Sequence, residues 1–306
     1  MTNANVSIII PALNEESSVG KLISRIRELH PDYEVIVVND GSTDQTAKVA
    51  KEAGARVYSH PYRIGNGAAV KAGIRQARGD VLVFMDADGQ HKPEEIEKLL
   101  APIPRYDMVV GARQKGGQAS VGRALGNRVY NLLASYVAKF KVEDLTSGFR
   151  AVKANIARQL LYLLPNSYSY PTTLTLSVLR NGLTLKYVPI SVRYRTSGKS
   201  QINLVKDGTR FFLIIVKICT LYSPFRIFLP ISAYIYLLGM VYYLYTYITI
   251  NRFTNMSALM FTTSVIVFMI GLVSEQISQM RYDRSENMEC PQPVEWREEG
   301  DGPPLG

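Results

Sequence analysis

The chain has 306 residues, 47% of them hydrophobic, and a formal net charge of +9. It is longer than one average domain, and its composition allows a full hydrophobic core. Two cysteines, Cys219 and Cys290, exclude a disulfide framework and a cysteine metal cluster, and they fit a reducing compartment. Because the N-terminus lacks a charged region followed by a long apolar one, we expect no signal peptide.

The charge is distributed unevenly along the chain. Residues 113–226 carry 18 basic and 3 acidic side chains, whereas residues 1–112 carry 13 basic and 15 acidic ones. Nucleic acid is one partner for a basic segment, but an anionic membrane surface is the better one here, because apolar stretches follow at once. We therefore expect membrane lipids, and no nucleic acid, as partners.

The first hundred residues alternate apolar runs with amphipathic stretches. The apolar runs predict strands at residues 6–10, 34–38, 56–58, 81–85 and 108–110. Helices are predicted from Ser17 or Ser18 to Leu29, from Ser42 or Thr43 to Ala53, and over residues 68–77 and 93–100. Near-continuous apolar strands that alternate with helices predict an α/β fold, with a mostly parallel sheet covered on both faces.

Two carboxylates follow the fourth predicted strand, at Asp86 and Asp88. Side chains in a strand alternate between faces, so the two aspartates should project to one side and Ala87 to the other. Two close carboxylates repel unless a cation lies between them, and their oxygens suit Mg²⁺ or Mn²⁺. A solvated Asp-x-Asp turn is the alternative interpretation.

Polar clusters follow three of the predicted strands, at residues 11–15, 39–42 and 86–88. Parallel α/β folds bind ligands outside the carboxyl ends of their strands. Each cluster alone can be ordinary loop chemistry, but all three at one edge favour a nucleotide site. In such a site Asp40 would contact the base or ribose, while Asp86, Asp88 and a metal ion would hold the diphosphate.

These segments resemble family 2 glycosyltransferases, and within that family the polyprenyl-phosphate (dolichol-phosphate) glycosyltransferases. The resemblance covers about residues 5–280 and is carried by Ser7–Glu15, Val38–Ser42, Gly67–Ala69, Asp86–Gln90 and Thr146–Arg150. It implies a GT-A catalytic domain that transfers a hexose, with inversion, from a nucleotide-diphosphate sugar such as UDP-glucose or GDP-mannose to a polyprenyl or dolichyl phosphate. Asn39 stands where relatives often have Asp, which leaves Asp40 as the expected base-recognition residue.

The resemblance also implies roles for individual residues. Asp86, Asp88 and Gln90 would coordinate Mg²⁺ or Mn²⁺. The next residue, His91, fits a position in contact with these ligands, and a role as a further metal ligand is the less favoured alternative. Asp86, Asp88 and Asp144 would be the catalytic residues. The nucleotide sugar would be bound by Pro11, Leu13, Asn14, Glu15, Asp40, Gly67, Asp86, Ala87 and Asp88.

The acceptor is expected near residues 111–150. Arg113, Arg123 and Arg128 accompany a flexible Gly-Gly loop and a helix-like segment, and guanidinium groups match phosphate oxygens. A solvated basic helix face is the alternative, but the resemblance places the lipid phosphate near Arg113 and Arg128. Asp144 would either orient the acceptor or the sugar, or pair with these arginines, and the sequence leaves both readings open.

A strand predicted at residues 188–192 leads into the basic segment 193–201. This segment resembles the loop with which the family covers the diphosphate and the acceptor. Arg195 and Lys199 are therefore predicted to bind the acceptor phosphate. A juxtamembrane electrostatic anchor is the rival interpretation, and the two are compatible.

Four segments are predicted: a GT-A domain (1–202), interfacial helices (203–226), a transmembrane hairpin (227–280) and a disordered tail (281–306). Residues 227–250 carry no charge and, as a helix, rise about 36 Å, enough to cross a membrane. A second span over residues 256–280 is interrupted only by Glu275, which is expected at the interface or against another subunit. A buried hairpin is the alternative. The flanking basic residues predict cytoplasmic termini and a cytoplasmic catalytic domain.

Three other functions are considered. A processive polysaccharide synthase usually carries a Gln-x-x-Arg-Trp motif, but the single Trp here is Trp296 in the tail. A transferase could use a non-phosphorylated lipid such as diacylglycerol, and a catalytically silent nucleotide-binding scaffold is the third option. Short two-helix anchors favour association between subunits, and related enzymes suggest a homo-tetramer. The sequence does not decide the sugar or the nucleotide.

Overall fold

The structure is a computed structural model that describes residues 5–113, 131–132, 135–136, 138–166, 169–191 and 223–286. The chain divides into two compact units. One contains the sheet and the other contains the C-terminal helices, and each is described by itself.

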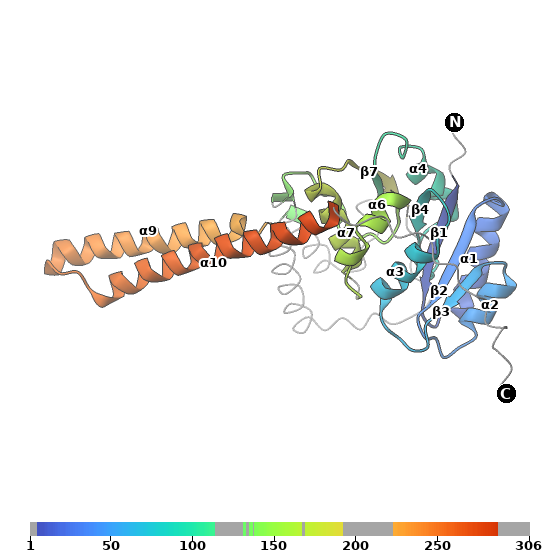
Figure 1. The fold of residues 1–306 in the computed structure, drawn as a ribbon, viewed down its shortest axis with the longest axis horizontal. Helices are drawn as coiled ribbons and strands as arrows, with labels where there is room; N and C mark the ends of the chain where they lie inside the picture. Colours follow the sequence, from blue (N-terminus) through green and yellow to red (C-terminus); the bar gives the residue numbers. More distant parts are fainter. Residues whose placement is uncertain are drawn as a thin grey trace. The chain divides into compact units, whose positions relative to one another are not determined.

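The sheet has seven strands in the order β3-β2-β1-β4-β6-β5-β7. Within the described residues, only β6 runs antiparallel to its neighbours, β4 and β5. The predicted α/β fold with a mostly parallel sheet is thus confirmed (Figure 1). The strands are β1 (Val6–Ala12), β2 (Glu34–Asn39), β3 (Arg56–Ser59), β4 (Val81–Phe84), β5 (Met108–Arg113), β6 (Arg150–Lys153) and β7 (Leu185–Ile190).

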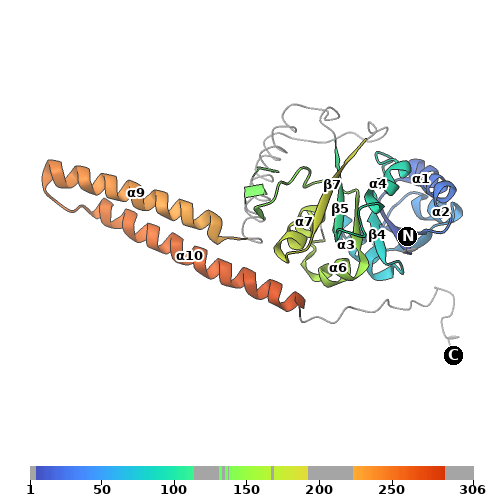
Figure 2. The same cartoon turned by 90° about the horizontal axis from the view of Figure 1, so that it is seen from above.

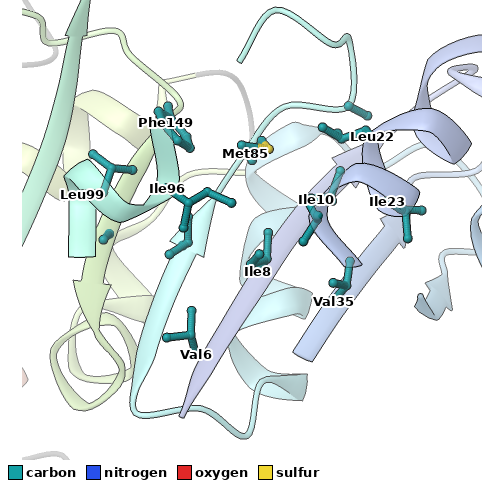
Figure 3. Close-up of a cluster of buried hydrophobic side chains, with 14 of the residues drawn as sticks. Val6, Ile8, Ile10, Leu22, Ile23, Val35, Met85, Ile96, Leu99 and Phe149 are labelled. Atoms are coloured by element: carbon teal, nitrogen blue, oxygen red, sulfur yellow. The ribbon is translucent and has the colours of Figure 1, made fainter. Parts of the chain in front are cut away.

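Helices cover both faces of the sheet. On one face, Leu22 of α1 and Ile96 of α4 belong to a buried cluster with Ile8 and Ile10 of β1 (Figure 3). On the other face, α3 lies so close that Gly73 has no room for a side chain next to Ile9. The helices of this unit are α1 (Glu16–Leu29), α2 (Thr46–Glu52), α3 (Asn66–Gln76), α4 (Ile96–Leu100), α6 (Ala154–Gln159) and α7 (Tyr170–Arg180), with short 3₁₀ turns at η1 (Pro93–Glu95) and η2 (Leu161–Leu163).

Some predicted boundaries were wrong. Strand β5, for example, continues to Arg113 instead of ending at residue 110. Helix α2 begins at Thr46, not at residue 42 or 43, because the backbone N–H groups of Ser42 and Thr43 donate to the side chains of Asn39 and Asn14. The strand predicted at residues 188–192 is β7, which starts earlier because its pairing with β5 begins at Leu185. Pro189 is tolerated there, since β7 is an edge strand.

The second unit is built on a helical hairpin. Helices α9 (Phe225–Ile250) and α10 (Asn255–Glu286) run side by side (Figures 1 and 2). Both are long and apolar enough to cross a membrane. Large apolar side chains such as Leu237 and Val241 are exposed, as expected for helices surrounded by lipid.

Small residues bring the two helices together. The Ser232 hydroxyl donates to the Ser264 carbonyl at 3.0 Å, and the Ser264 hydroxyl donates back to the Ser232 carbonyl at 3.0 Å. A Cβ on Gly271 would lie 2.7 Å from Cβ of Phe228. Interhelical hydrogen bonds and close backbone contact at small residues are the usual means of association where no hydrophobic driving force exists.

Two features mark the ends of the hairpin, and the expected position of Glu275 at the membrane interface or against another subunit stays a prediction. Glu275 accepts hydrogen bonds from the Ser223 hydroxyl and from the Phe225 N–H, both at 3.2 Å, so this carboxylate contacts the first turn of α9 in its own chain. Helix α10 continues to Glu286, so residues 281–286 are helical although they were predicted as part of a disordered tail. Of the interfacial segment predicted at 203–226, residues 203–222 lie outside the described residues, and Phe225 and Arg226 belong to α9.

Candidate functional site

The three predicted polar clusters meet at one edge of the sheet. Strands β1, β2 and β4 are parallel, so the residues that follow them lie at the same edge. Strand β5 is antiparallel to β6 and ends at this edge with Arg113. Strand β6 begins there, which brings the segment before Arg150 to the same place.

The first two clusters are cross-linked by hydrogen bonds. Asn14 adopts a left-handed backbone (φ 55°), its N–H donates to the Ser42 hydroxyl at 3.0 Å, and its side-chain oxygen accepts from the Thr43 N–H at 2.9 Å. The Glu15 N–H donates to the Thr46 hydroxyl at 2.8 Å. Two of the residues predicted to bind the nucleotide sugar, Asn14 and Glu15, therefore also hold two loops of the edge together. Pro11 is buried in β1 and Leu13 is half-buried beside it.

Asp40 holds the loop that leads into α3. Its side chain is buried, and Oδ1 accepts from His60 Nδ1 at 2.8 Å and from the Ile64 N–H at 2.9 Å. Oδ2 accepts from the Gly65 N–H at 2.8 Å. This loop ends one residue before the first turn of α3, where Gly67 is buried. The predicted contact between Asp40 and a base or ribose stays a prediction, and the structure adds a loop-holding role.

The carboxylate couplet directly follows β4. Asp86 and Asp88 are both half-buried and Ala87 between them is buried, and Ala87 and Asp88 lie in a turn beyond the end of β4. The projection of both carboxylates to one side stays a prediction. Asp88 accepts a hydrogen bond from the Gln90 N–H at 3.1 Å across a turn formed by Gly89 (φ 69°). The Asp86 side chain is 38% exposed, so it remains accessible to a ligand.

The predicted metal ligands fit a hard divalent cation. Asp86, Asp88 and Gln90 offer two carboxylates and an amide oxygen close together in the chain, and Mg²⁺ is often bound by one or two carboxylates together with substrate phosphates. In the part of the chain that the structure describes, no three His, Cys, Asp or Glu side chains converge on one point. The predicted metal site does not require three such side chains, because its third ligand is the amide oxygen of Gln90.

The segment Gly148–Phe149 packs against Asp86, and this contact was not predicted from the sequence. A Cβ on Gly148 would lie 2.6 Å from Asp86 Oδ2, so only glycine leaves room for that carboxylate. The next residue, Phe149, stacks on the buried ring of His91 with 5.0 Å between ring centroids. His91 Nε2 is 3.7 Å from Asp86 Oδ2.

Arg113 and Asp144 form a bidentate ion pair. Arg113 Nε donates to Asp144 Oδ2 at 2.7 Å, and Nη2 donates to Oδ1 at 2.9 Å and to the Thr146 hydroxyl at 2.6 Å. Burial disfavours the charged form of Asp144, but hydrogen bonds and charge from Arg113 outweigh it and hold the pKa of Asp144 below its ordinary value. The same hydrogen bonds raise the pKa of Arg113. Of the two readings left open, the structure favours the ion pair.

The other predicted acceptor-binding residues lie outside the described part of the chain. They are Arg123, Arg128, Arg195 and Lys199.

Arg150 ends one of the segments that carry the family resemblance, Thr146–Arg150, but no role was predicted for this residue. Its side chain is fully buried, and Nη1 donates to the Pro171 carbonyl at 2.7 Å and to the Thr175 hydroxyl at 3.1 Å, both in α7. Nη2 donates to the Ser147 carbonyl. Burial lowers the pKa of Arg150, while the aromatic hydroxyls and the carboxylates nearby, Asp86 among them, oppose that shift.

Comparison with known proteins identifies both units. Residues 7–161 match the family described as glycosyl transferase family 2, and residues 223–280 match the family described as the GtrB C-terminal hairpin. The first match covers strands β1 to β6 in chain order and includes Asp86 and Asp88. The second covers α9 and most of α10.

Curated relatives align over most of the chain. An undecaprenyl-phosphate 4-deoxy-4-formamido-L-arabinose transferase of Proteus mirabilis is 29% identical over 76% of this chain and 73% of its own length. An undecaprenyl-phosphate mannosyltransferase of Micrococcus luteus is 31% identical over 65% of this chain and 87% of its own length. A protein of unassigned function from Methanocaldococcus jannaschii is 30% identical over 70% of this chain and 92% of its own length.

Solved structures share the fold. Glucosyl-3-phosphoglycerate synthase of Mycobacterium tuberculosis in complex with phosphoglyceric acid superposes with a TM-score of 0.58 at 24% identity, over 71% of this chain and 79% of that one. The same enzyme with Mn²⁺ and UDP-glucose gives a TM-score of 0.57 at 23% identity, over 71% and 78%. The expected GT-A fold is confirmed by this likeness. The family match over residues 7–161 and the aligned relatives show that this chain belongs to glycosyl transferase family 2 and carries a GtrB-type C-terminal hairpin.

Proposed function

We propose that the protein transfers a hexose, with inversion, from a nucleotide-diphosphate sugar to a polyprenyl phosphate. The observation that carries this proposal is the alignment, in a chain with a matching hairpin, with transferases whose names give undecaprenyl phosphate as the acceptor. The Asp86–Asp88 couplet at the carboxyl edge of the sheet supports a nucleotide-sugar donor, because this is where α/β folds bind such ligands.

The donor side of the proposed site is built from the sheet edge. Asp86, Asp88 and Gln90 would hold Mg²⁺ or Mn²⁺, which would supply positive charge to the departing nucleoside diphosphate. The loop held by Asp40 and the cross-linked Asn14–Glu15 turn flank this position on the neighbouring strands. These residues would orient the nucleotide so that the anomeric carbon faces the acceptor.

The acceptor needs little activation. A phosphomonoester has a second pKa near ~6, so a polyprenyl phosphate is largely dianionic at neutral pH and already nucleophilic. Asp144 is paired with Arg113 and its pKa is lowered, which makes it a weak proton acceptor. The reaction proposed here therefore uses no strong general base, and the predicted role of Asp144 becomes the placement of Arg113. Arg113, Arg123, Arg128, Arg195 and Lys199 would bind the lipid phosphate.

The hairpin would anchor the enzyme where its acceptor lies. Helices α9 and α10 are long enough to span a bilayer, and basic residues before the first and after the second outnumber the single Arg252 between them. The positive-inside rule then places the catalytic domain and both termini in the cytoplasm. Association of the short anchors into a homo-tetramer is part of the same proposal.

The test is an assay of the full chain in detergent against a panel of sugar nucleotides, with a short polyprenyl phosphate and Mn²⁺. At least one donor should give a lipid-linked sugar, and Asp86→Ala should abolish the transfer while the protein still partitions into membranes. Asp80→Ala, at an exposed position away from the couplet, serves as the control. Near-normal metal-dependent transfer by Asp86→Ala would contradict the proposed metal site.

The acceptor is tested separately. Arg128→Ala should raise the concentration of polyprenyl phosphate needed for half-maximal rate far more than that of the sugar nucleotide, because a phosphate-binding guanidinium is lost. Arg105→Ala, on the exposed surface, should change neither. Equal transfer to diacylglycerol in place of the lipid phosphate would favour the alternative acceptor class instead.

A further inference from the structure

Arg150 is the first residue of β6, an inner strand of the sheet. In β6 it pairs with Phe84 of β4 and with Val110 of β5, so its side chain projects to the same face as theirs. That face is covered by α7, whose Tyr170 packs edge-on against Phe84 at 6.4 Å. A guanidinium in this position has lost all contact with water, and burying such a charge is costly unless its hydrogen bonds are made.

The hydrogen bonds of Arg150 join two parts of the chain. Nη1 binds the Pro171 carbonyl and the Thr175 hydroxyl in the first half of α7, and Nη2 binds the Ser147 carbonyl just before β6. Among the described residues, no carboxylate hydrogen-bonds with Arg150. Nη1 and Nη2 therefore donate to neutral oxygens, while Nε is buried without a partner among the described residues. The hydrogen bonds of the two Nη atoms fix the segment Ser147–Arg150 against α7.

The segment that Arg150 fixes is the one that touches Asp86. Gly148 leaves no space for a Cβ beside Asp86 Oδ2, and Phe149 stacks on His91, whose Nε2 lies 3.7 Å from the same oxygen. Asp86 is thus contacted by Gly148 directly and by Phe149 through His91. A shift of a few tenths of an ångström in this segment would change the orientation of the carboxylate.

We infer that Arg150 is a positioning residue that sets the orientation of the Asp86 carboxylate through Gly148 and through the stacked Phe149–His91 pair. The inference rests on the proposed function, in which Asp86 is a metal ligand. Residues behind a metal ligand typically affect metal affinity about 10- to 100-fold. A purely structural Arg150 would change stability but would leave the metal affinity of the folded protein unchanged.

Two substitutions test the inference from opposite ends. Arg150→Lys keeps the charge but replaces a planar fork by a single ammonium, which cannot serve three oxygens in the same geometry. Gly148→Ala adds one methyl group against Asp86 Oδ2, at a position whose backbone is not left-handed, so the change acts through contact alone. If Arg150→Lys fails to fold, Gly148→Ala still tests whether this segment controls Asp86.

Each variant has a matched control in the same unit. Gly20→Ala also adds a methyl group in a tight space, 2.8 Å from a Val49 methyl, but on α1. Arg158→Lys also weakens a hydrogen bond from an arginine to a carbonyl, that of Ala77 at 2.7 Å, but on α6. Mn²⁺ alone is titrated into the full-length protein in detergent, free Mn²⁺ is measured by electron paramagnetic resonance, and thermal melts confirm folding.

Gly148→Ala and Arg150→Lys should each weaken Mn²⁺ binding about tenfold or more relative to their controls. The affinities for Mg²⁺, measured by competition with Mn²⁺, should rank the proteins in the same order. Equal Mn²⁺ affinities in a folded variant and its control would overturn the inference, while Asp86-dependent sugar transfer by the wild type would leave the proposed function intact. Absence of Mn²⁺ binding to the wild type, or binding that Asp86→Asn does not reduce, would overturn both.

Discussion

Asp40→Asn gives a sharp test of how the edge of the sheet is built. In the wild type, Asp40 accepts three hydrogen bonds, from His60 and from the backbone N–H groups of Ile64 and Gly65. Asparagine has the same shape but only one acceptor oxygen. If that oxygen still accepts the hydrogen bonds from His60 and the Ile64 N–H, the new NH₂ group lies where Oδ2 accepted from the Gly65 N–H at 2.8 Å. Two donors then face each other.

The magnitude follows from these three bonds. An unsatisfied buried N–H costs about 1–3 kcal/mol, and each of the two remaining bonds weakens by about 1 kcal/mol when its acceptor loses its charge. The loop from His60 to Gly65 should therefore become at least about 3 kcal/mol less stable against local opening. Since 1.4 kcal/mol corresponds to a factor of ten, this predicts a loss of protection of at least about 100-fold.

Hydrogen exchange of the Ile64 and Gly65 amides measures the effect directly, without a substrate. Asp80→Asn is the control, because Asp80 is exposed and, within the described residues, its carboxylate accepts a single long hydrogen bond, at 3.3 Å from the Asn5 N–H. Unchanged protection of these two amides in Asp40→Asn would refute the loop-holding role. It would leave nucleotide recognition as the remaining reason for a carboxylate at this position.

Three further predictions concern other contacts. Because Arg113 outweighs the effect of burial and keeps the folded-state pKa of Asp144 below its ordinary value near ~3.9, the stabilisation by this pair is present at neutral pH and is lost as the pH falls through the folded-state pKa. The urea midpoint of the wild type should thus fall more between pH 7 and pH 3 than that of Asp144→Asn, and an equal fall would count against the pair. Glu275→Ala should cost the start of α9 about 1 kcal/mol and speed exchange of the Phe225 amide about fivefold, whereas an unchanged rate would show that the cap is dispensable. Gly271→Leu should push α9 and α10 apart at their close contact, and spin labels on the two helices should report a longer distance; the same distance would contradict the packing described here.

The parallel part of the sheet could be predicted because its signals are local. The run from Val81 to Met85 is apolar and bounded by turn residues, and β4 forms within it. Strand β6 offers no such signal, since its four residues begin with Arg150 and end with Lys153. It is a strand because β4 and β5 pair with it from both sides, and pairing of this kind is not visible in a single sequence.

The candidate site also has features that could be predicted from the sequence and features that could not. The Asp86–Asp88 couplet could be recognised because both residues follow one strand at alternate positions. The pairing of Arg113 with Asp144 joins residues far apart in the sequence, and the sequence alone could only leave two readings of Asp144. The burial of Arg150 could not be predicted, because an arginine in a short strand that begins and ends with a basic residue is usually solvated. One signal was available for α7, where a Pro at residue 171 marks a helix start.

The reversed direction of β6 has a consequence for how such enzymes can diversify. Since β5 ends and β6 begins at the same rim, the polypeptide between Arg113 and Arg150 starts and ends at that rim. Its base is tied by the Gly111 N–H to the Phe149 carbonyl at 2.9 Å and by the Arg113–Asp144 pair. Grafting the residues between Arg113 and Arg150 from one relative to another, with both ties retained, should exchange the choice of acceptor while the donor half of the site and the seven-stranded sheet stay unaltered.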